Sequence, residues 1–194
     1  MKKLFRILLI IDPQNDFITG NLAVSGAYEK IKALSNSDLS KYDYIGVTLD
    51  SHPSNHCSFK ENGGIWPNHC IVHTNGWDIP LYLEQALKNS NVQLGYYHKG
   101  TDPNQEEYSI FDSEDGYFLA NQILDIFINN NGYVQIDICG IAGDYCVLET
   151  HKGLRKFIGD DCITVLTEYT ASIDGGDTLM NYIENNDLNY DINR

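Results

Sequence analysis

The chain has 194 residues, of which 42% are hydrophobic, and a formal net charge of -14. This length and composition allow one substantial hydrophobic core without disulfide or metal staples, so we expect a single domain over residues 1–194. The negative charge argues against binding to the phosphate backbone of nucleic acid and offers no basic face to an anionic membrane. No run approaches the roughly 20 apolar residues that span a bilayer.

The cysteines and the N-terminal segment indicate a cytoplasmic protein. Five cysteines, an odd number, are scattered at positions 57, 70, 139, 146 and 162 without a CxxC pair. Such usage suits a reducing compartment better than a disulfide scaffold. The segment MKKLFRILLIID is basic and then apolar, but it runs into Asp12 without a small-residue cleavage site. We therefore expect a first strand there and not a signal peptide.

Short apolar runs alternate with segments of helix-like spacing along the chain. In chain order they predict strand 4–11, helix 28–34, strand 44–49, helix 81–87, strand 92–97, helix 117–128, strand 133–139, helix 147–157, strand 162–166 and helix 178–183. This alternation predicts an α/β fold of three layers: a doubly wound, mainly parallel sheet with helices on both faces. Ligands of such sheets bind beyond the carboxyl ends of the strands.

Metal-binding residue types follow the second predicted strand. Asp50 comes directly after it, and His52, His56 and His69 lie in the long irregular stretch 51–79. Residues two apart in an extended segment point the same way, so Asp50 and His52 should face one side of the strand end. With His69 they form a mixed nitrogen and oxygen set that suits zinc, iron or manganese and leaves positions open for water or substrate. His56 is either a fourth ligand or a neighbour of the ligands.

Two other interpretations of these residues stay open. Each histidine, taken alone, is equally well explained as a loop residue that hydrogen-bonds to the backbone. Cys57 and Cys70 are the sequence neighbours of His56 and His69. A closed Cys/His structural site is therefore conceivable, although the paired spacing typical of such sites is missing.

Cys146 is the candidate nucleophile. It lies in GIAGDYCV between a predicted strand and a predicted helix, where free amides and the positive end of the helix dipole favour a thiolate and could bind an oxyanion. Asp12 in IIDPQNDF and Lys99 in YYHKG also follow predicted strands, so the three side chains meet if those strands are neighbours. Asp12 could then accept the thiol proton and later return it, while Lys99 lowers the thiol pKa.

Each of these three residues also has a simpler explanation. Cys146 alone is more often a small buried residue than a nucleophile. Asp12 could only cap the turn that follows it, and Lys99 could be a solvated charge.

The segments around these residues resemble those of a known family. IIDPQNDF, TLDSHPSNHCSF, WPNHC, HKGTDPNQEEYSIF and GIAGDYCV are similar, in order and spacing, to the signature segments of the nicotinamidases, the metal-containing branch of the isochorismatase-like cysteine hydrolases. The similarity extends from about residue 8 to about residue 170. It implies hydrolysis of nicotinamide to nicotinate and ammonia through a cysteine thioester in NAD salvage, and pyrazinamide as an analogous substrate.

The resemblance assigns two sets of side chains. Those that attack the carboxamide are, by position, Asp12, Lys99 and Cys146. Those that bind one divalent transition metal ion, with zinc as the first choice and iron or manganese as alternatives, are Asp50, His52 and His69. The family varies at the place of His56.

The resemblance also implies a substrate pocket. Phe17, Trp66 and Tyr108 match the aromatic positions that line it, and the backbone at Ala142 and Cys146 matches the oxyanion hole. We expect a cis peptide bond before Ala142. Flat aromatic walls select a planar heterocycle whose ring nitrogen the metal could hold, although each aromatic residue alone could equally be a packing residue.

Two further functions stay open at this point. Another isochorismatase-like amide or carbamoyl-amide hydrolase would use the same triad without needing the metal set. A non-catalytic metal-binding or structural protein would leave Cys146 merely packed. The expected partner is the small-molecule substrate nicotinamide; we expect no nucleic acid and no membrane, and a homo-oligomer is left open.

Overall fold

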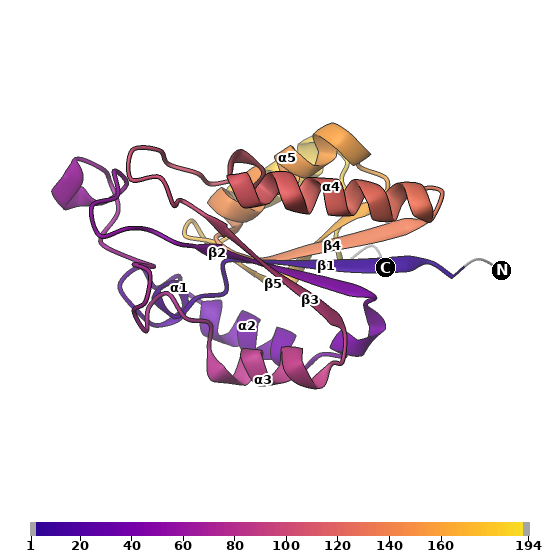
Figure 1. The fold of residues 1–194 in the computed structure, drawn as a ribbon, viewed down its shortest axis with the longest axis horizontal. Helices are drawn as coiled ribbons and strands as arrows, with labels where there is room; N and C mark the ends of the chain where they lie inside the picture. The colour runs from indigo at the N-terminus through magenta and orange to yellow at the C-terminus, as the bar shows by residue number, and fades with distance from the viewer. Residues whose placement is uncertain (1–2, 192–194) are drawn as a thin grey trace.

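The computed structural model describes residues 3–191, so the two ends of the predicted 1–194 domain lie outside the described residues. One five-stranded sheet runs through the centre of the protein (Figure 1), built of β1 (Phe5–Ile11), β2 (Tyr44–Asp50), β3 (Gln93–Lys99), β4 (Val134–Ile141) and β5 (Ile163–Ala171). The strand order is β3-β2-β1-β4-β5 and every pairing is parallel. The predicted α/β fold with a parallel sheet is confirmed.

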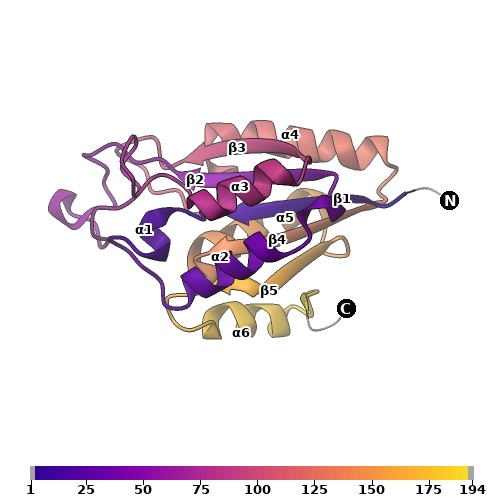
Figure 2. The ribbon, with the colours of Figure 1, turned by 90° about the horizontal axis from the view of Figure 1, so that it is seen from below.

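Helices cover both faces of this sheet. The α-helices are α1 (Asn15–Ile18), α2 (Ala27–Asn36), α3 (Leu81–Asn89), α4 (Glu114–Asn129), α5 (Leu148–Ile158) and α6 (Asp177–Asn185). Figure 1 shows α2 and α3 on one face and α4 and α5 on the other, and Figure 2 shows α6 beside β5. Short 3₁₀ helices span Leu39–Lys41, Lys60–Asn62 and Ile110–Asp112, and a π-helical turn spans Gly143–Val147.

The predicted elements lie where the sequence places them, with ends displaced by a few residues. The largest displacement is in β5, which continues to Ala171 instead of ending at residue 166. Its second half is partly exposed at Thr167, Glu168 and Tyr169, so the apolar run stops before the strand does. The four-residue helix α1 was not predicted, because it is shorter than any periodic pattern.

The central strand β1 explains why the apolar run at the N-terminus is continuous. Residues Ile7, Leu8, Leu9, Ile10 and Ile11 are all completely buried. The even-numbered ones pack in the core shared with α2 and α3, and the odd-numbered ones pack in the core on the other face. A parallel strand covered on both sides needs apolar residues at every position, because each side chain meets a helix layer.

The strand order reverses at β1, so the carboxyl end of this strand is the expected place of a ligand site. From β1 the chain builds outward to β2 and β3 on one side, and then returns to pair β4 with the other side of β1. In open parallel sheets the point where the strand order reverses is where ligands bind. The ends of β2 and β3 lie level there, with Asp50 paired to Lys99.

Two further findings concern the described residues as a whole. No helix between residues 3 and 191 is long and apolar enough to cross a bilayer. All five cysteines are described, and each is free.

Gly95 in β3 gives a test of the packing between the sheet and α4. A Cβ at Gly95 would overlap the hydroxyl of Tyr44, which shares a hydrogen bond of 2.5 Å with the hydroxyl of Tyr97. We expect Gly95→Ala to lower the free energy of unfolding by about 1–3 kcal/mol, since neighbouring atoms must move. Urea unfolding measures the loss.

Gly46, the partner of Gly95 in β2, provides the matched control. The nearest atom to a Cβ there is the end of the flexible Leu9 side chain, at 3.0 Å, and the rings of Tyr44 and Tyr97 lie at an ordinary contact distance of 3.6 Å. Gly46→Ala should therefore cost less than Gly95→Ala. Equal losses would contradict the packing described.

Candidate active site

The ammonium group of Lys99 lies at the centre of a buried polar cluster. Its Nζ is 2.9 Å from Oδ2 of Asp12, contacts Oδ1 of Asp50, and is 3.5 Å from Sγ of Cys146. Lys99 and Asp12 are completely buried, and Asp50 and Cys146 are nearly so. The structure thus brings together the three predicted catalytic side chains from the ends of β1 and β3 and from the turn after β4.

Thr48 fixes the carboxylate of Asp12. The Thr48 hydroxyl donates a hydrogen bond of 2.6 Å to Oδ1 of Asp12, and the Asp12 amide donates to the Thr48 carbonyl at 3.1 Å. Oδ2 is left facing Lys99, with no aligned hydrogen bond from any described residue. Sequence reasoning missed Thr48; the available signal was a hydroxyl residue inside the otherwise apolar run YIGVTLD.

Burial dominates the protonation of the two groups that would exchange a proton. It raises the pKa of the Asp12 carboxyl, although the charge of Lys99 opposes the shift. Burial also raises the pKa of the Cys146 thiol well above its usual range, against the lowering effect of Lys99. The sequence predicted that Lys99 would favour a thiolate, but burial outweighs it. Both groups therefore have pKa values above their usual range, and a carboxylate with a raised pKa is a better base.

Lys99 itself stays charged. Burial alone would lower its pKa, but the charges of Asp12 and Asp50 raise it well above the usual range. For Asp50, burial would raise the pKa, but Lys99 and His52 together lower it. A permanent cation therefore lies between two carboxylates.

Asp50 faces two histidines with its other oxygen. Oδ2 of Asp50 is 3.5 Å from Nε2 of His52 and 3.9 Å from Nε2 of His69. Nδ1 of His52 hydrogen-bonds to the carbonyl of Gly100, and Nδ1 of His69 to the carbonyl of Pro67. A carbonyl only accepts, so each neutral ring carries its proton on Nδ1 and keeps a lone pair on Nε2.

These residues fit a metal ion. Nε2 of His52 is completely buried and finds no hydrogen-bond partner among the described residues, which is costly unless something else satisfies it. Asp50, His52 and His69 offer ligand atoms that all lie within 4.8 Å of one another. One carboxylate and two imidazoles whose ligand atoms lie this close together are the donors expected of a zinc, iron or manganese site.

His56 lies differently from the other two histidines. Its ring stacks on His52 with centroids 4.0 Å apart. Its Nε2 donates to the carbonyl of Gln105 at 2.9 Å, and its Nδ1 is 2.7 Å from the hydroxyl of Ser58. Both ring nitrogens of His56 thus have protein partners in this structure, and the fourth-ligand role that the sequence left possible stays a prediction.

Two side chains that sequence reasoning left without a role hold the cluster in place. Oε1 of Gln14 accepts from the amide of Asp50 at 2.8 Å, and Nε2 donates to the Asp50 carbonyl, also at 2.8 Å. Gln14 therefore continues the hydrogen-bond ladder beside β2 after β1 has turned away. Glu107 accepts from the amide of Gly100, whose carbonyl in turn binds His52. Both side chains are polar and completely or almost completely buried. This burial, which is visible only in the structure, is what marks them.

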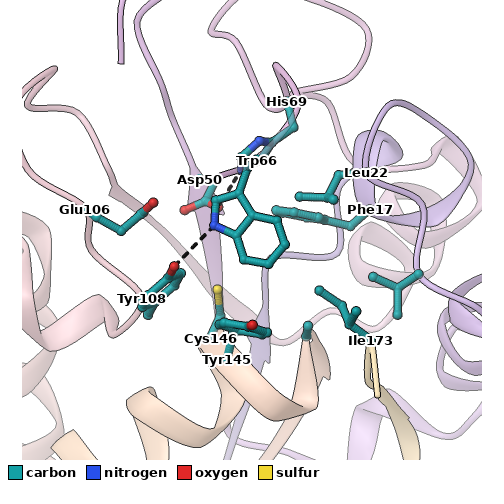
Figure 3. Close-up of a pocket in the computed structure, with 12 residues that line it drawn as sticks. Phe17, Leu22, Asp50, Trp66, His69, Glu106, Tyr108, Tyr145, Cys146 and Ile173 are labelled. Atoms are coloured by element: carbon teal, nitrogen blue, oxygen red, sulfur yellow. Dashed lines mark hydrogen bonds and ion pairs between the residues drawn. The ribbon is translucent and has the colours of Figure 1, made fainter. Parts of the chain in front are cut away.

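A pocket of about 360 Å³ opens above the thiol of Cys146. This volume includes open solvent at the mouth of the pocket. The predicted residues Phe17, Trp66, Tyr108 and Ala142 all line it, and the predicted cis bond is present at Ile141–Ala142. Figure 3 shows the indole of Trp66 over the pocket, donating to the Tyr108 hydroxyl at 3.2 Å. Sequence reasoning missed the remaining wall: Leu22, Val24, Glu106, Tyr145 and Ile173.

The chain is similar to known proteins over most of its length. It is 31% identical over 183 residues to the nicotinamidase/pyrazinamidase of Mycobacterium tuberculosis, covering 90% of both proteins. The chain belongs to the nicotinamidase/pyrazinamidase family. It is also 32% identical over 173 residues to the nicotinamidase of Acinetobacter baylyi, covering 78% of this chain and 77% of the relative. No protein-family model matches the chain.

Solved structures of the family share the fold. The pyrazinamidase of Pyrococcus horikoshii in complex with zinc is 27% identical, with a TM-score of 0.75 over 96% of this chain and 98% of that one. PnC1 from L. infantum in complex with nicotinate is also 27% identical, with a TM-score of 0.80 over 96% and 92%. Membership of the nicotinamidase/pyrazinamidase family makes this protein an amidohydrolase, and Asp50, His52 and His69 form a group that could hold a metal ion.

The protonation of Cys146 can be measured directly. Because burial raises its pKa, the thiol stays neutral to higher pH than a free cysteine, whose pKa is about 8.5. Only the thiolate is alkylated, so the rate at which iodoacetamide modifies Cys146 should rise with pH and reach its midpoint above that value. Mass spectrometry of the peptide that carries Cys146 gives the rate, with free cysteine as the control. A midpoint below that of free cysteine would contradict the assignment.

Proposed function

We propose that this protein hydrolyses nicotinamide to nicotinate and ammonia through a thioester on Cys146. The observation that carries the proposal is the contact of one buried ammonium, Lys99, with the carboxylate of Asp12 and the sulfur of Cys146 beneath an aromatic pocket. Family membership supports the substrate, since the relatives of more than 30% identity carry the name nicotinamidase. Pyrazinamide is proposed as a second substrate on the same ground.

The pocket would select and orient a flat ring. Aromatic side chains from three separate segments, Phe17, Trp66 and Tyr108, would contact the two faces and the edge of a pyridine. Asp50, His52 and His69 would hold one divalent ion, with zinc as the first choice. When bound, this ion supplies a Lewis acid that can hold the ring nitrogen. The carboxamide group is then left beside Cys146.

The first half of the reaction forms the thioester. Asp12 takes the proton of the Cys146 thiol as the sulfur adds to the carboxamide carbon. The backbone amides of Ala142 and Cys146 are proposed to stabilise the oxyanion that develops on the carboxamide oxygen. Asp12 then gives its proton to the amide nitrogen, the carbon–nitrogen bond breaks, and ammonia leaves.

The second half releases the acid. Asp12, again a carboxylate, removes a proton from a water molecule that attacks the thioester carbon. The carbon–sulfur bond breaks, nicotinate departs, and the proton returns to the sulfur. Lys99 keeps its charge in every step and holds the Asp12 carboxylate in position. Nicotinate is a precursor of NAD, so we place the reaction in NAD salvage.

Ammonia release is the direct test of this function. Purified protein should release ammonia from nicotinamide, lose that activity on treatment with a metal chelator, and regain it when zinc, iron or manganese is restored. Activity on nicotinamide that resists complete metal removal would favour an amidohydrolase of another kind that uses the triad alone. No ammonia from nicotinamide at any metal content would refute the proposal.

Variants of the two stacked histidines, His52 and His56, distinguish a metal ligand from a packing neighbour. His52→Ala removes an unpartnered Nε2 that faces Asp50, so we expect it to lower the content of bound metal at least tenfold. His56→Ala removes a ring whose nitrogens are both engaged by protein, so metal content should stay within about twofold of the wild type. Metal content per chain is measured by mass spectrometry of the elements. Equal losses in both variants would contradict the assignment.

A further inference from the structure

The loop that follows β5 supplies a wall of the pocket. Ile173 lies two residues beyond the end of β5 at Ala171, lines the pocket and is 46% exposed. Figure 3 shows Ile173 and Tyr108 on opposite sides of Cys146. A large apolar side chain half open to solvent at the rim of a pocket is available to touch whatever enters it.

Asp144 fixes this loop relative to the nucleophile. Its Oδ1 accepts from the amide of Ile173 at 3.0 Å and its Oδ2 accepts from the amide of Asp174 at 3.1 Å. Asp144 belongs to the same π-helical turn, Gly143–Val147, that carries Cys146. One carboxylate therefore ties the Ile173 backbone to the turn that positions the sulfur.

Two further contacts stiffen the loop. A Cβ at Gly143 would overlap the hydroxyl of Ser172, so the glycine permits the turn and the loop to touch. Asp174 accepts from the amide of Gly176 at 2.9 Å and from the amide of Thr178 at 2.8 Å, which anchors the loop at the start of α6. The backbone at Ile173 is thus held on both sides, and it moves away from the pocket only if these hydrogen bonds break.

The residues that line the pocket include an ionisable group and an aliphatic group. Asp50, His69 and Glu106 are its ionisable members apart from the sulfur and the phenols, while Leu22, Val24 and Ile173 are aliphatic. In the proposed reaction the ring nitrogen of nicotinamide faces the metal ligands and its carboxamide faces Cys146. The four remaining ring carbons carry only hydrogen: position 2 lies between the nitrogen and the carboxamide-bearing carbon, and positions 4 to 6 form the opposite edge. Such an apolar edge fits an aliphatic wall.

We propose that Ile173, held by Asp144, is a specificity-determining residue that limits substituents on the apolar edge of a pyridine carboxamide. The proposal rests on the nicotinamidase function proposed above. It predicts that the wild-type pocket accepts the unsubstituted ring and discriminates against a group at ring position 5, because the added atoms meet the Ile173 side chain.

The test compares two substrates in purified, metal-loaded enzyme. The ratio of kcat/KM for 5-methylnicotinamide to kcat/KM for nicotinamide should rise about tenfold in Ile173→Ala, the size expected when room is made for one methyl group in an apolar pocket. It should fall in Ile173→Phe. Asp144→Ala should raise the ratio as well, since the loop loses its clamp. Taking a ratio removes any general loss of activity that these variants share.

Ile128, another exposed isoleucine at the end of α4 with 67% of its surface accessible, provides the matched control. Ile128→Ala should leave the ratio unchanged. An unchanged ratio in both Ile173 variants, with nicotinamide still hydrolysed, would overturn the role of Ile173 and leave the proposed function standing. Failure of the wild type to hydrolyse nicotinamide would overturn the proposed function itself.

Discussion

The site depends on one buried ammonium group. Lys99 is completely buried and would be costly to desolvate alone, so its charge requires the carboxylates of Asp12 and Asp50 around it. Those carboxylates come from two other strands, and the sulfur of Cys146 comes from a turn after a third. The parallel sheet is what makes this meeting possible, because its strands all end at the same edge. Removing Lys99 leaves two buried carboxylates without their shared cation, and removing either carboxylate leaves Lys99 with only one counter-charge.

The ion pair of Lys99 with Asp50 connects the charge cluster to the candidate metal ligands. Asp50 contacts Lys99 with one oxygen and faces His52 and His69 with the other. A single carboxylate thus belongs both to the charge cluster around the nucleophile and to the candidate metal ligands. Gln14 holds the backbone of this residue at both its amide and its carbonyl. The position of one strand end therefore sets the distance between the charge cluster around Lys99 and the candidate metal ligands.

Much of this arrangement could be predicted from sequence, for a physical reason. Strand β1 is covered on both faces, so its apolar run is unbroken and easy to recognise, and the reactive Asp12 that follows it stands out. The residues whose roles could not be predicted act through contacts with residues far away in the sequence. Gln14 and Asp144 bind backbone amides 36 and 29 residues away, and no local pattern records such partners. The hydrogen bond of His56 to the carbonyl of Gln105 likewise joins residues 49 positions apart. Burial also raises the pKa of the Cys146 thiol, an effect that the helix-start position alone does not reveal.

Ammonia release by the Cys146→Ala variant tests the central claim most directly. This change removes the sulfur but none of the candidate metal ligands, so the protein should fold, bind its metal as the wild type does, and release no ammonia from nicotinamide above the uncatalysed rate. Cys162→Ala, which removes a half-buried thiol outside the pocket lining, should keep full activity. Ammonia release by folded, metal-bound Cys146→Ala at a rate near that of the wild type would contradict the account.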